Sequence, residues 1–498
     1  MTAARATSAQ PRNRRVAAFG HRNYRLFFAG QAISLVGSWM QVVAQDWLVL
    51  QVSGGQPFWL GVVSAAQFLP PTILGLFGGV IADALPKRQT LRATQVVFMS
   101  LAAILAVLTA TDNVSVAVIV LLALLLGCTN AVDMPARQSF SVELVGPEDV
   151  GNAVALNASI FNGARVIGPA IAGLLIGAVG IAAAFAINAV SFLAAIAALQ
   201  LMRDNELHRA RFLNVPHSPH EVRENLAEGL AYVRRTPIVL MAISVVGVVA
   251  TLGMNYNVLT PPLAQQVLGS DAAGYGFLMT AAGIGALAGA VTLVLAGPPR
   301  PWRIPTGAIV LGVATLLLSS SRSYPMSLVL MVPIGFGGVF MAATANATIQ
   351  LHSPDGLRGR VMSVYTTVFS ASVPVGGIAA GTLAATLGVP ATLAISGGLS
   401  VLAGLGAAVW WWRIRDRGTE PAHAPAAPAS TASTSAPTTA QATPIEAGSE
   451  VVRPFANLYV NVKVVVRYDR DEPSSHARPT HGSRGSRTSA RRAGRRCS

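Results

Sequence analysis

Charged residues are scarce in this 498-residue chain. They account for 11% of it, while 52% of the residues are hydrophobic. A soluble domain carries about 25% charged residues, because it needs polar surface to cover its core. The composition therefore predicts a membrane protein.

Cysteines and nucleotide-binding loops are also lacking. Cys128 and Cys497 are the two cysteines, which excludes a disulfide framework and a zinc pattern. No GxxxxGK[ST] loop occurs, so we do not expect this chain alone to be an ATP-driven pump. The sequence shows no nucleophile–base pairing and no cluster of metal ligands. We therefore predict that the protein is not an enzyme and needs no metal or cofactor.

Long apolar windows are what the sequence does contain. Twelve of them are long enough to cross ~30 Å of hydrocarbon. They lie at 26–50, 58–83, 93–111, 114–133, 151–179, 181–202, 237–264, 273–297, 304–321, 325–349, 361–386 and 388–412. The first window is too long for the apolar part of a signal peptide. We expect an all-α membrane protein in which this window is retained as the first span.

The cations give the orientation of these spans. Of the 36 Lys and Arg residues, 34 fall in segments that a twelve-span topology places on one side, while Arg322 falls in a loop on the other side and Arg165 within a span. Cytoplasmic loops carry an excess of Lys and Arg. The pattern predicts a multi-pass protein of the cell membrane with both termini cytoplasmic. The net charge of +15 is explained by topology, so no nucleic-acid partner is expected.

The two halves of the chain resemble each other at an offset of 208 residues. The stretch VALNASIFNGARVIGPAIAG at 154–173 aligns with MSVYTTVFSASVPVGGIAAG at 362–381. Chance similarity between Gly/Ala-rich helices is the alternative. Parallel halves related by an axis along the membrane normal are typical of one large class of secondary transporter. The repeat therefore predicts two pseudo-symmetric six-helix bundles.

A short polar cluster follows the second span. Gly79 lies one turn before Asp83, and Lys87 and Arg88 follow within the expected loop. Gly79 permits close approach of a neighbouring helix, and Asp83 can accept hydrogen bonds or pair with a cation. Such a cluster can lock two bundles together on the cytoplasmic side and release them. A solvated turn with cationic anchors is the alternative.

The spacing Gly79-x3-Asp83-x3-Lys87-Arg88 resembles the signature loop of the major facilitator superfamily. More narrowly, residues 20–412 resemble the enterobactin-exporter-like group of drug:proton antiporters. The supporting stretches are NYRLFFAGQAISLVGSWMQVVAQDWLVLQ, ARQSFSVELVGPEDVGNAVALN, GYGFLMTAAGIGALAGA and GLRGRVMSVY. The resemblance implies the major facilitator fold. In the second half, LAGPPRPWRIP lacks the Gly and Asp of this spacing, so an equivalent lock is not expected there.

Span five carries a second element of this kind. Its Gly168-Pro169 is followed by Ala172 and Gly173, where the exporter-associated pattern of the superfamily has paired glycines. By resemblance this favours export over uptake. Pro169 frees a backbone carbonyl, while Gly163, Gly168 and Gly173 permit close helix packing. An ordinary glycine-rich packing face is the alternative.

Two charges lie well within the spans. They are Asp46 in span one, toward the outer side, and Arg165 near the middle of span five. Isolated charges in hydrocarbon are costly, so each must face protein or water. We interpret Asp46 as a candidate proton-coupling carboxylate and Arg165 as the group that holds it or the substrate. Anchoring of Asp46 in interfacial water near Trp47 is the alternative for that residue.

Span one also carries a polar stripe on one helical face, at Gln31, Ser34, Ser38, Gln41 and Gln45. Further candidates for a polar, aromatic-lined substrate cavity are Asn157, Asn162, Asn255, Asn257, Asn346, Trp39, Phe161 and Tyr365. Such a cavity suits an amphipathic organic molecule. For each single amide, hydrogen bonding between helices is the alternative.

The chain divides into five segments: a basic N-terminus at 1–25, a six-helix bundle at 26–202, a linker at 203–236, a second bundle at 237–412 and a basic tail at 413–498. Within the linker, an apolar face predicts a helix on the membrane surface or a solvated connector. The tail is expected to be disordered, although NLYVNVKVVVRY at 457–468 alternates like a strand.

Asp133 and Arg137, at the inner end of span four, suit either a gate or a helix cap.

Together these features predict a secondary transporter. The first hypothesis is proton-coupled export of amphipathic small molecules (a drug, a siderophore or a metabolite) by alternating access. The alternatives are a facilitator that imports a metabolite and a receptor or scaffold that transports nothing. The expected partners are a small-molecule substrate, protons and the lipid bilayer, and we expect a monomer.

Overall fold

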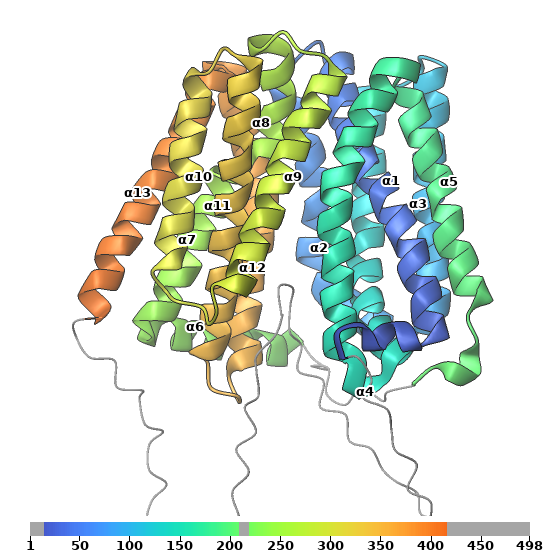
Figure 1. The fold of residues 1–498 in the computed structure, drawn as a ribbon, viewed down its shortest axis with the longest axis vertical. Coiled ribbons are helices and arrows are strands. Elements are labelled where there is room, and N and C mark those ends of the chain that lie inside the picture. The colour runs from blue at the N-terminus through green and yellow to red at the C-terminus, as the bar shows by residue number, and fades with distance from the viewer. Residues whose placement is uncertain (1–13, 209–218, 416–498) are drawn as a thin grey trace, which may run out of the picture.

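The computed structural model describes residues 14–208 and 219–415, and its regular elements there are all helical (Figure 1). A short helix, η1 (Arg14–Gly20), precedes the first half. The long helices of that half are α1 (Arg22–Val52), α2 (Pro57–Ala84), α3 (Lys87–Ala110), α4 (Val116–Val179) and α5 (Ile181–Leu201).

A one-turn helix, η2 (Asp204–Glu206), ends the described part of the first half. The second half consists of α6 (Pro219–Arg235), α7 (Pro237–Leu252), α8 (Tyr256–Pro262), η3 (Leu263–Val267), α9 (Ala272–Leu295), α10 (Arg303–Ser320), α11 (Tyr324–Leu351), α12 (Arg358–Leu387) and α13 (Val389–Arg415).

The described helices make twelve passes. Eleven segments are long and apolar enough to cross a membrane, and one of them, α4, has 64 residues. At ~1.5 Å per residue this is about three times the thickness of the hydrocarbon. Gly146 interrupts α4 with a φ of 72° and a ψ of 173°, so the helix makes two passes. The prediction of an all-α protein with twelve spans is confirmed.

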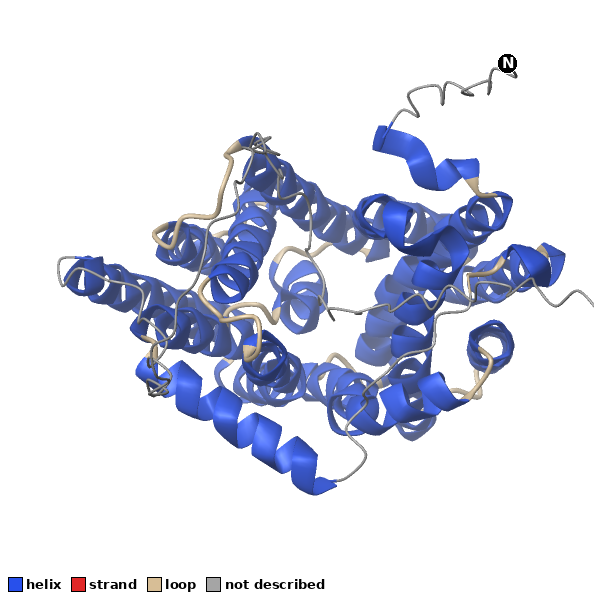
Figure 2. Ribbon diagram, turned by 90° about the horizontal axis from the view of Figure 1, so that it is seen from below, coloured by secondary structure: helices blue, strands red, loops and turns tan. Residues whose placement is uncertain are grey.

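The passes form two bundles that lie side by side (Figure 1). The N-terminal bundle contains α1–α5, and the C-terminal bundle contains α7–α13. They meet mainly where α2 packs on α12 and α4 packs on α9, with smaller contacts of α1 and α2 on α8 and of α1 on α9; we call this whole junction the seam. The ends of the molecule that carry Arg22, Lys87, Arg303 and Arg358 form one face, called here the basic face, and Figure 2 views the helices from this side.

The offset of 208 residues reappears in the backbone. Gly180 joins α4 to α5 and Gly388 joins α12 to α13, with φ values of 99° and 85°. Glycine adopts such positive angles without steric cost. The paired positions Gly173 and Gly381 both pack against the other bundle, on α9 and α2 respectively. The predicted pseudo-symmetry of the two bundles is therefore present in the fold.

Two segments expected as loops are helical. The first pass of α4 continues beyond 133 to Val145, because Phe140, Leu144 and Val145 are buried against the start of α1 and the end of α5. The expected nine-residue loop after span two is reduced to Leu85 and Pro86. Proline suits the first positions of a helix, where its missing N–H is not needed.

Span seven is broken in its second half. Gly253 and Asn255 separate α7 from α8, which continues as a π-helical turn in η3. Asn255 Nδ2 donates to the carbonyl of Thr251 at 2.5 Å and to that of Ala250 at 3.4 Å, which the break leaves without helical partners. Within a membrane, a break of this kind is tolerated where the backbone is buried in protein or lines a water-filled cavity.

Helix α6 packs beneath the C-terminal bundle. Its Val233 is buried, Gly229 lies against the backbone of Arg360, and Tyr232 Oη donates to the carbonyl of His352 at 2.5 Å. Leu226 remains exposed. The linker helix therefore uses part of its apolar face on protein. The predicted disordered tail and its strand-like stretch lie outside the described residues, apart from the end of α13.

Candidate functional site

The two charged side chains within the central spans both lie at the seam. Tyr275 Oη of α9 donates to Asp46 Oδ2 of α1 at 2.9 Å. Arg165 of α4 donates from Nη2 to Tyr256 Oη of α8. Each of these two charges of the N-terminal bundle is therefore held by a tyrosine of the C-terminal bundle. Sequence reasoning missed both tyrosines, although Tyr275 stands in the quoted stretch GYGFLMTAAGIGALAGA.

The two charges lie at different depths. Arg165 is about 18 residues into the second pass of α4, which places it near the middle of that pass. Its guanidinium carbon lies 5.8 Å from the ring centroid of Trp39, and Asp46 follows Trp39 in α1 by about seven residues, or ~10 Å of helix. Arg165 and Asp46 are therefore placed apart in this conformation.

Aromatic rings surround both charges. Trp39 and Phe161 meet edge to face with ring centroids 5.7 Å apart, beside Arg165. Trp47 stacks on Tyr275 with centroids 6.1 Å apart, beside Asp46. Trp47 is buried, so packing on Tyr275 accounts for it better than anchoring at the membrane surface. The site thus combines one cation, one carboxylate and ring surfaces at the junction of the bundles.

Glycines allow the close approach that brings these groups together. A Cβ on Gly276 of α9 would lie 2.8 Å from the Cα of Gly173. Gly168 is equally tight, since its Cβ would lie 2.5 Å from the Cβ of Trp39. Around Gly163, by contrast, a Cβ would meet nothing within 4 Å. Gly168 and Gly173 therefore serve the predicted packing in this conformation, whereas Gly163 faces open space.

Pro169 explains why α9 can pack on α4 here. A proline has no N–H, so the carbonyl of Arg165, four residues earlier, loses its helical partner. Gly283 of α9 lies against this carbonyl, and Thr280 Oγ1 donates to the neighbouring carbonyl of Val166 at 3.3 Å. The freed backbone thus faces the other bundle.

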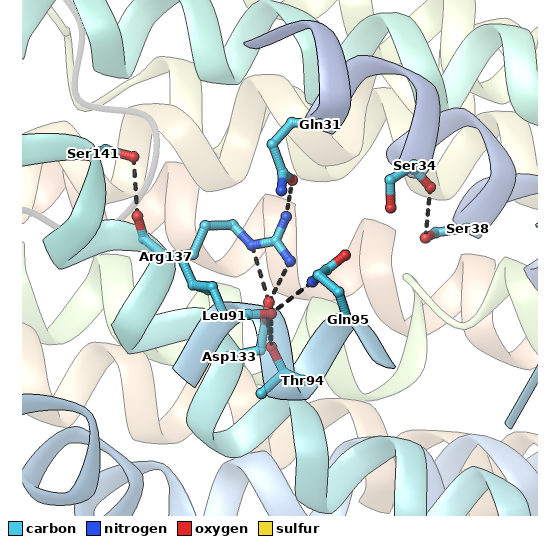
Figure 3. A network of polar contacts seen from close by, with 9 residues as sticks. All are labelled: Gln31, Ser34, Ser38, Leu91, Thr94, Gln95, Asp133, Arg137 and Ser141. Carbon is cyan, nitrogen blue, oxygen red and sulfur yellow. Dashed lines mark hydrogen bonds and ion pairs between the residues drawn. The ribbon is translucent and has the colours of Figure 1, made fainter. Parts of the chain in front are cut away.

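A second polar network lies inside the N-terminal bundle, between α1, α3 and α4 (Figure 3). Asp133 is 2% exposed. Its Oδ1 accepts from Thr94 Oγ1 at 2.6 Å and from Gln95 Nε2 at 3.2 Å. Arg137 donates from Nε to Asp133 Oδ2 at 2.9 Å and also bonds Gln31 Oε1. Asp133 and Arg137 therefore tie three helices together and do not cap a helix end.

Most amides of the predicted cavity have partners within their own bundle. Gln41 Oε1 accepts from Asn188 Nδ2 of α5 at 2.5 Å. Asn157 accepts from Tyr24 Oη and donates to Ser141 Oγ, both at 3.1 Å. Gln31, Gln41 and Asn157 thus contribute hydrogen bonds between helices, which was the alternative to a cavity role.

Four of the other candidates bond within their own helical segments, and Tyr365 of α12 bonds the neighbouring α11. Ser38, Asn162 and Asn255 donate to carbonyls of their own helical segments, while Asn346 accepts from Gln350 on the same helix and Tyr365 donates to the carbonyl of Ala342. Gln45 and Ser34 are buried. Trp39, Phe161 and Arg165, which are partly exposed at the seam, are better placed to meet a ligand.

The cations after span two are engaged within the N-terminal bundle. Arg88 donates to the carbonyl of Leu199 at 2.7 Å and pairs with Asp204, which satisfies the C-terminal end of α5. Lys87 lies 3.8 Å from the buried Glu143. Gly79 and Asp83 belong to the last turns of α2, whose side chains at 75–84 lie outside the described residues.

Two pseudo-symmetric six-helix bundles that meet at charged groups are the architecture of one large class of secondary membrane transporter. Residues 14–435 match a family described as transmembrane secretion effectors. That match spans most of the sequence. The chain belongs to this family of the major facilitator superfamily, whose members transport small molecules and are not enzymes.

Three similar proteins are transporters, as expected for this family. The multidrug efflux pump Tap of Mycolicibacterium fortuitum is 30% identical over 371 residues, covering 72% of this chain and 89% of the relative. The staphyloferrin A transporter of Staphylococcus aureus is 25% identical over 390 residues, covering 75% and 92%. Macrolide efflux protein A of Streptococcus pyogenes is 22% identical over 390 residues, covering 76% and 95%.

Solved structures with the same fold include a mutant of the peptide transporter POT, with a TM-score of 0.64 at 15% identity and coverage of 82% of this chain and 99% of that one. The nucleoside transporter NupG superposes with a TM-score of 0.62 at 11% identity, covering 80% and 100%. At these identities the likeness concerns the fold alone. It agrees with the major facilitator fold predicted from the sequence.

Proposed function

We propose that this protein exports amphipathic small organic molecules across the cell membrane in exchange for protons, with the basic face in the cytoplasm. The observation that carries the proposal is the pair of bonds Asp46–Tyr275 and Arg165–Tyr256, which join the bundles inside the spans. Two of its relatives, the multidrug efflux pump Tap and macrolide efflux protein A, favour export. Both bundles and the bonds between them belong to one chain, so we propose a monomer as the transporting unit.

The positions of the seam contacts support alternating access. Gln266 Nε2 of η3 donates to the carbonyl of Gly55 at 2.5 Å, at the face opposite the basic one. Gly61 and Gly377 pack so closely on the same side that a Cβ on Gly61 would lie 2.3 Å from the Gly377 carbonyl oxygen. In this conformation the half of the seam away from the basic face is closed. Opening that half requires these contacts to separate.

Asp46 is the residue we propose for proton coupling. A neutral, protonated carboxyl fits the packed seam, whereas an ionised one is costly there and favours opening toward water. A proton taken up from outside would then promote closure of the outer half. After the proton leaves to the cytoplasm, the ionised carboxylate would favour reopening with substrate bound. This order of events is that of an antiporter.

Inverted membrane vesicles with a preformed pH gradient test the proposal. We expect at least one compound of a broad panel of amphipathic organic molecules, with fluorescein among them, to dissipate the gradient with wild-type protein, and Asp46→Asn to abolish this effect. Asp112→Asn, in the loop between α3 and α4, is the matched control. Dissipation that persists in Asp46→Asn would remove Asp46 from the mechanism. Substrate uptake without any gradient would favour a facilitator, and no flux at all would favour a scaffold.

A further inference from the structure

The guanidinium of Arg165 has spare binding capacity. It carries five N–H donors, and within the described part of the chain it forms one hydrogen bond, to Tyr256 Oη, and lies over the Trp39 ring. Among the described residues, no carboxylate forms an ion pair with it. A buried or half-buried cation of this kind ordinarily has an anionic partner.

Arg165 points toward the interior of the protein. The exposed stripe of the same pass consists of Ile167, Ile171 and Leu174, which are 50%, 41% and 58% exposed. At about 100° per residue, Arg165 lies roughly 180–240° around the helix from these three. The apolar stripe suits contact with lipid, so the exposed part of the guanidinium faces the seam.

Ring surfaces flank this cation at the same depth. Phe161 precedes Arg165 by one helical turn, so both side chains lie on one face of α4. Trp39 of α1 meets Phe161 edge to face and Arg165 face on. A cation beside two partly exposed rings offers ionic bonds to an acidic group and apolar contact to the body that carries it.

The same geometry disfavours a positively charged ligand at this level. Asp46, the other charge at the seam, lies ~10 Å beyond Trp39 along α1 and is bonded to Tyr275. A ligand cation near Trp39 would therefore face Arg165 without a neighbouring carboxylate among the described residues.

We propose that Arg165, Trp39 and Phe161 form a subsite for the acidic group of an aromatic organic anion, a carboxylate on a flat ring system. This inference rests on the proposed transport function and names the substrate class of the same site. The two carboxylate oxygens accept from the guanidinium in bidentate fashion. The ring body packs against Trp39 and Phe161.

Binding to the full-length protein in lipid nanodiscs tests this subsite without requiring transport. The probes are fluorescein and its methyl ester, which differ in the carboxylate, followed by fluorescence anisotropy. We expect the acid to bind at least ~10-fold more tightly than the ester, as loss of a hydrogen-bonded charge pair implies. Arg165→Gln is expected to remove this difference, and Arg165→Lys to keep part of it. Arg322→Gln, in the loop between α10 and α11, should leave it unchanged.

Equal dissociation constants for acid and ester in the wild type, or binding of neither, would overturn the subsite. So would an Arg165→Gln variant that weakens both probes to the same extent. If Arg165→Gln does not fold, as judged by its melting temperature, the acid-to-ester ratios of the wild type and Arg165→Lys decide. Acid-selective binding without proton-coupled flux would refute the proposed export and leave the subsite in place. Proton-coupled flux without acid-selective binding would refute the subsite and leave the proposed export in place.

Discussion

At the seam between the bundles, a tyrosine side chain provides both apolar packing and a hydrogen bond. Its ring packs in an apolar contact, as Tyr275 does on Trp47, while its hydroxyl supplies one hydrogen bond. A single neutral donor can be replaced by water when the bundles part. Asp133 differs, because it accepts from three side chains within one bundle. The tyrosine contacts therefore suit a junction that opens, and the Asp133 network suits a permanent one.

Replacing Asp133 by Ala should destabilise the N-terminal bundle. Breaking a buried ion pair costs about 3–5 kcal/mol when the other charge is left unpaired, but Arg137 is 26% exposed and can reach water. We therefore expect the free energy of unfolding to fall by about 1–3 kcal/mol in Asp133→Ala. Asp133→Asn should be less affected, because the amide oxygen can still accept from Thr94. The melting temperature in detergent measures both variants.

The control for this change is Asp204→Ala. Asp204 pairs with Arg88, but its side chain is 63% exposed. Exposed ion pairs contribute about 0–1 kcal/mol to stability. The melting temperature of Asp204→Ala should therefore stay close to that of the wild type. An Asp133→Ala variant as stable as Asp204→Ala would contradict a structural role for the network.

At the scale of helices, the contact between α4 and α9 depends on the absence of side chains. Gly276→Ala would place a Cβ 2.5 Å from the Pro169 carbonyl oxygen and 2.8 Å from the Cα of Gly173. Backbone atoms cannot yield as a flexible side chain would, so the two helices must separate. We expect transport to fall because α4 and α9 can no longer close against each other. Substrate-dependent loss of the pH gradient in vesicles measures this effect.

The same substitution at Gly163 provides the comparison. Its Cβ would meet nothing within 4 Å, and alanine is favoured over glycine in a helix by up to about 1 kcal/mol. Gly163→Ala should therefore keep or slightly raise the melting temperature. Equal loss of transport in both variants would show that helix flexibility, and not the seam, is what the glycines provide.

The sequence was sufficient to place the spans because hydrocarbon selects for them directly. A window such as 181–202 must be apolar whatever its neighbours are, and α5 occupies Ile181–Leu201. Helix ends at the basic face were harder to predict. There, Phe140 and Leu144 extend α4 because they are buried on other helices, and a hydropathy pattern does not contain that information.

The candidate site was predictable in part for the same reason. Asp46 and Arg165 stand out because isolated charges in spans are rare. Their partners Tyr256 and Tyr275 come from the other half of the chain, and nothing in local spacing indicates which tyrosine reaches which charge. The amides show the converse. Gln41 and Asn157 carry the polarity expected of a cavity, but tertiary structure gives them partners inside the bundle.

At the scale of the whole molecule, the bonds of the seam set the balance between two arrangements of the bundles. Tyr256 and Tyr275 each take part in one hydrogen bond between the bundles, and we expect both bonds to break when the outer half of the seam opens. At about 1 kcal/mol per bond, removing both bonds shifts the balance by about 2 kcal/mol, which is roughly 30-fold in the equilibrium constant between the two arrangements. The double variant Tyr256→Phe/Tyr275→Phe should therefore favour the arrangement in which the face opposite the basic one is open.

Distances between spin labels measure this shift. In a background with Cys128 and Cys497 replaced by serine, we would label positions 113 and 323, one in a loop of each bundle on the face opposite the basic one. Labels at 206 and 356 report on the basic face. In the double variant the first distance should lengthen and the second shorten. Tyr365→Phe removes a bond to Ala342 within the C-terminal bundle and should change neither distance. Unchanged distances in the double variant would mean that the glycine contacts alone hold the seam closed. The tyrosine bonds would then not set the balance between the two arrangements.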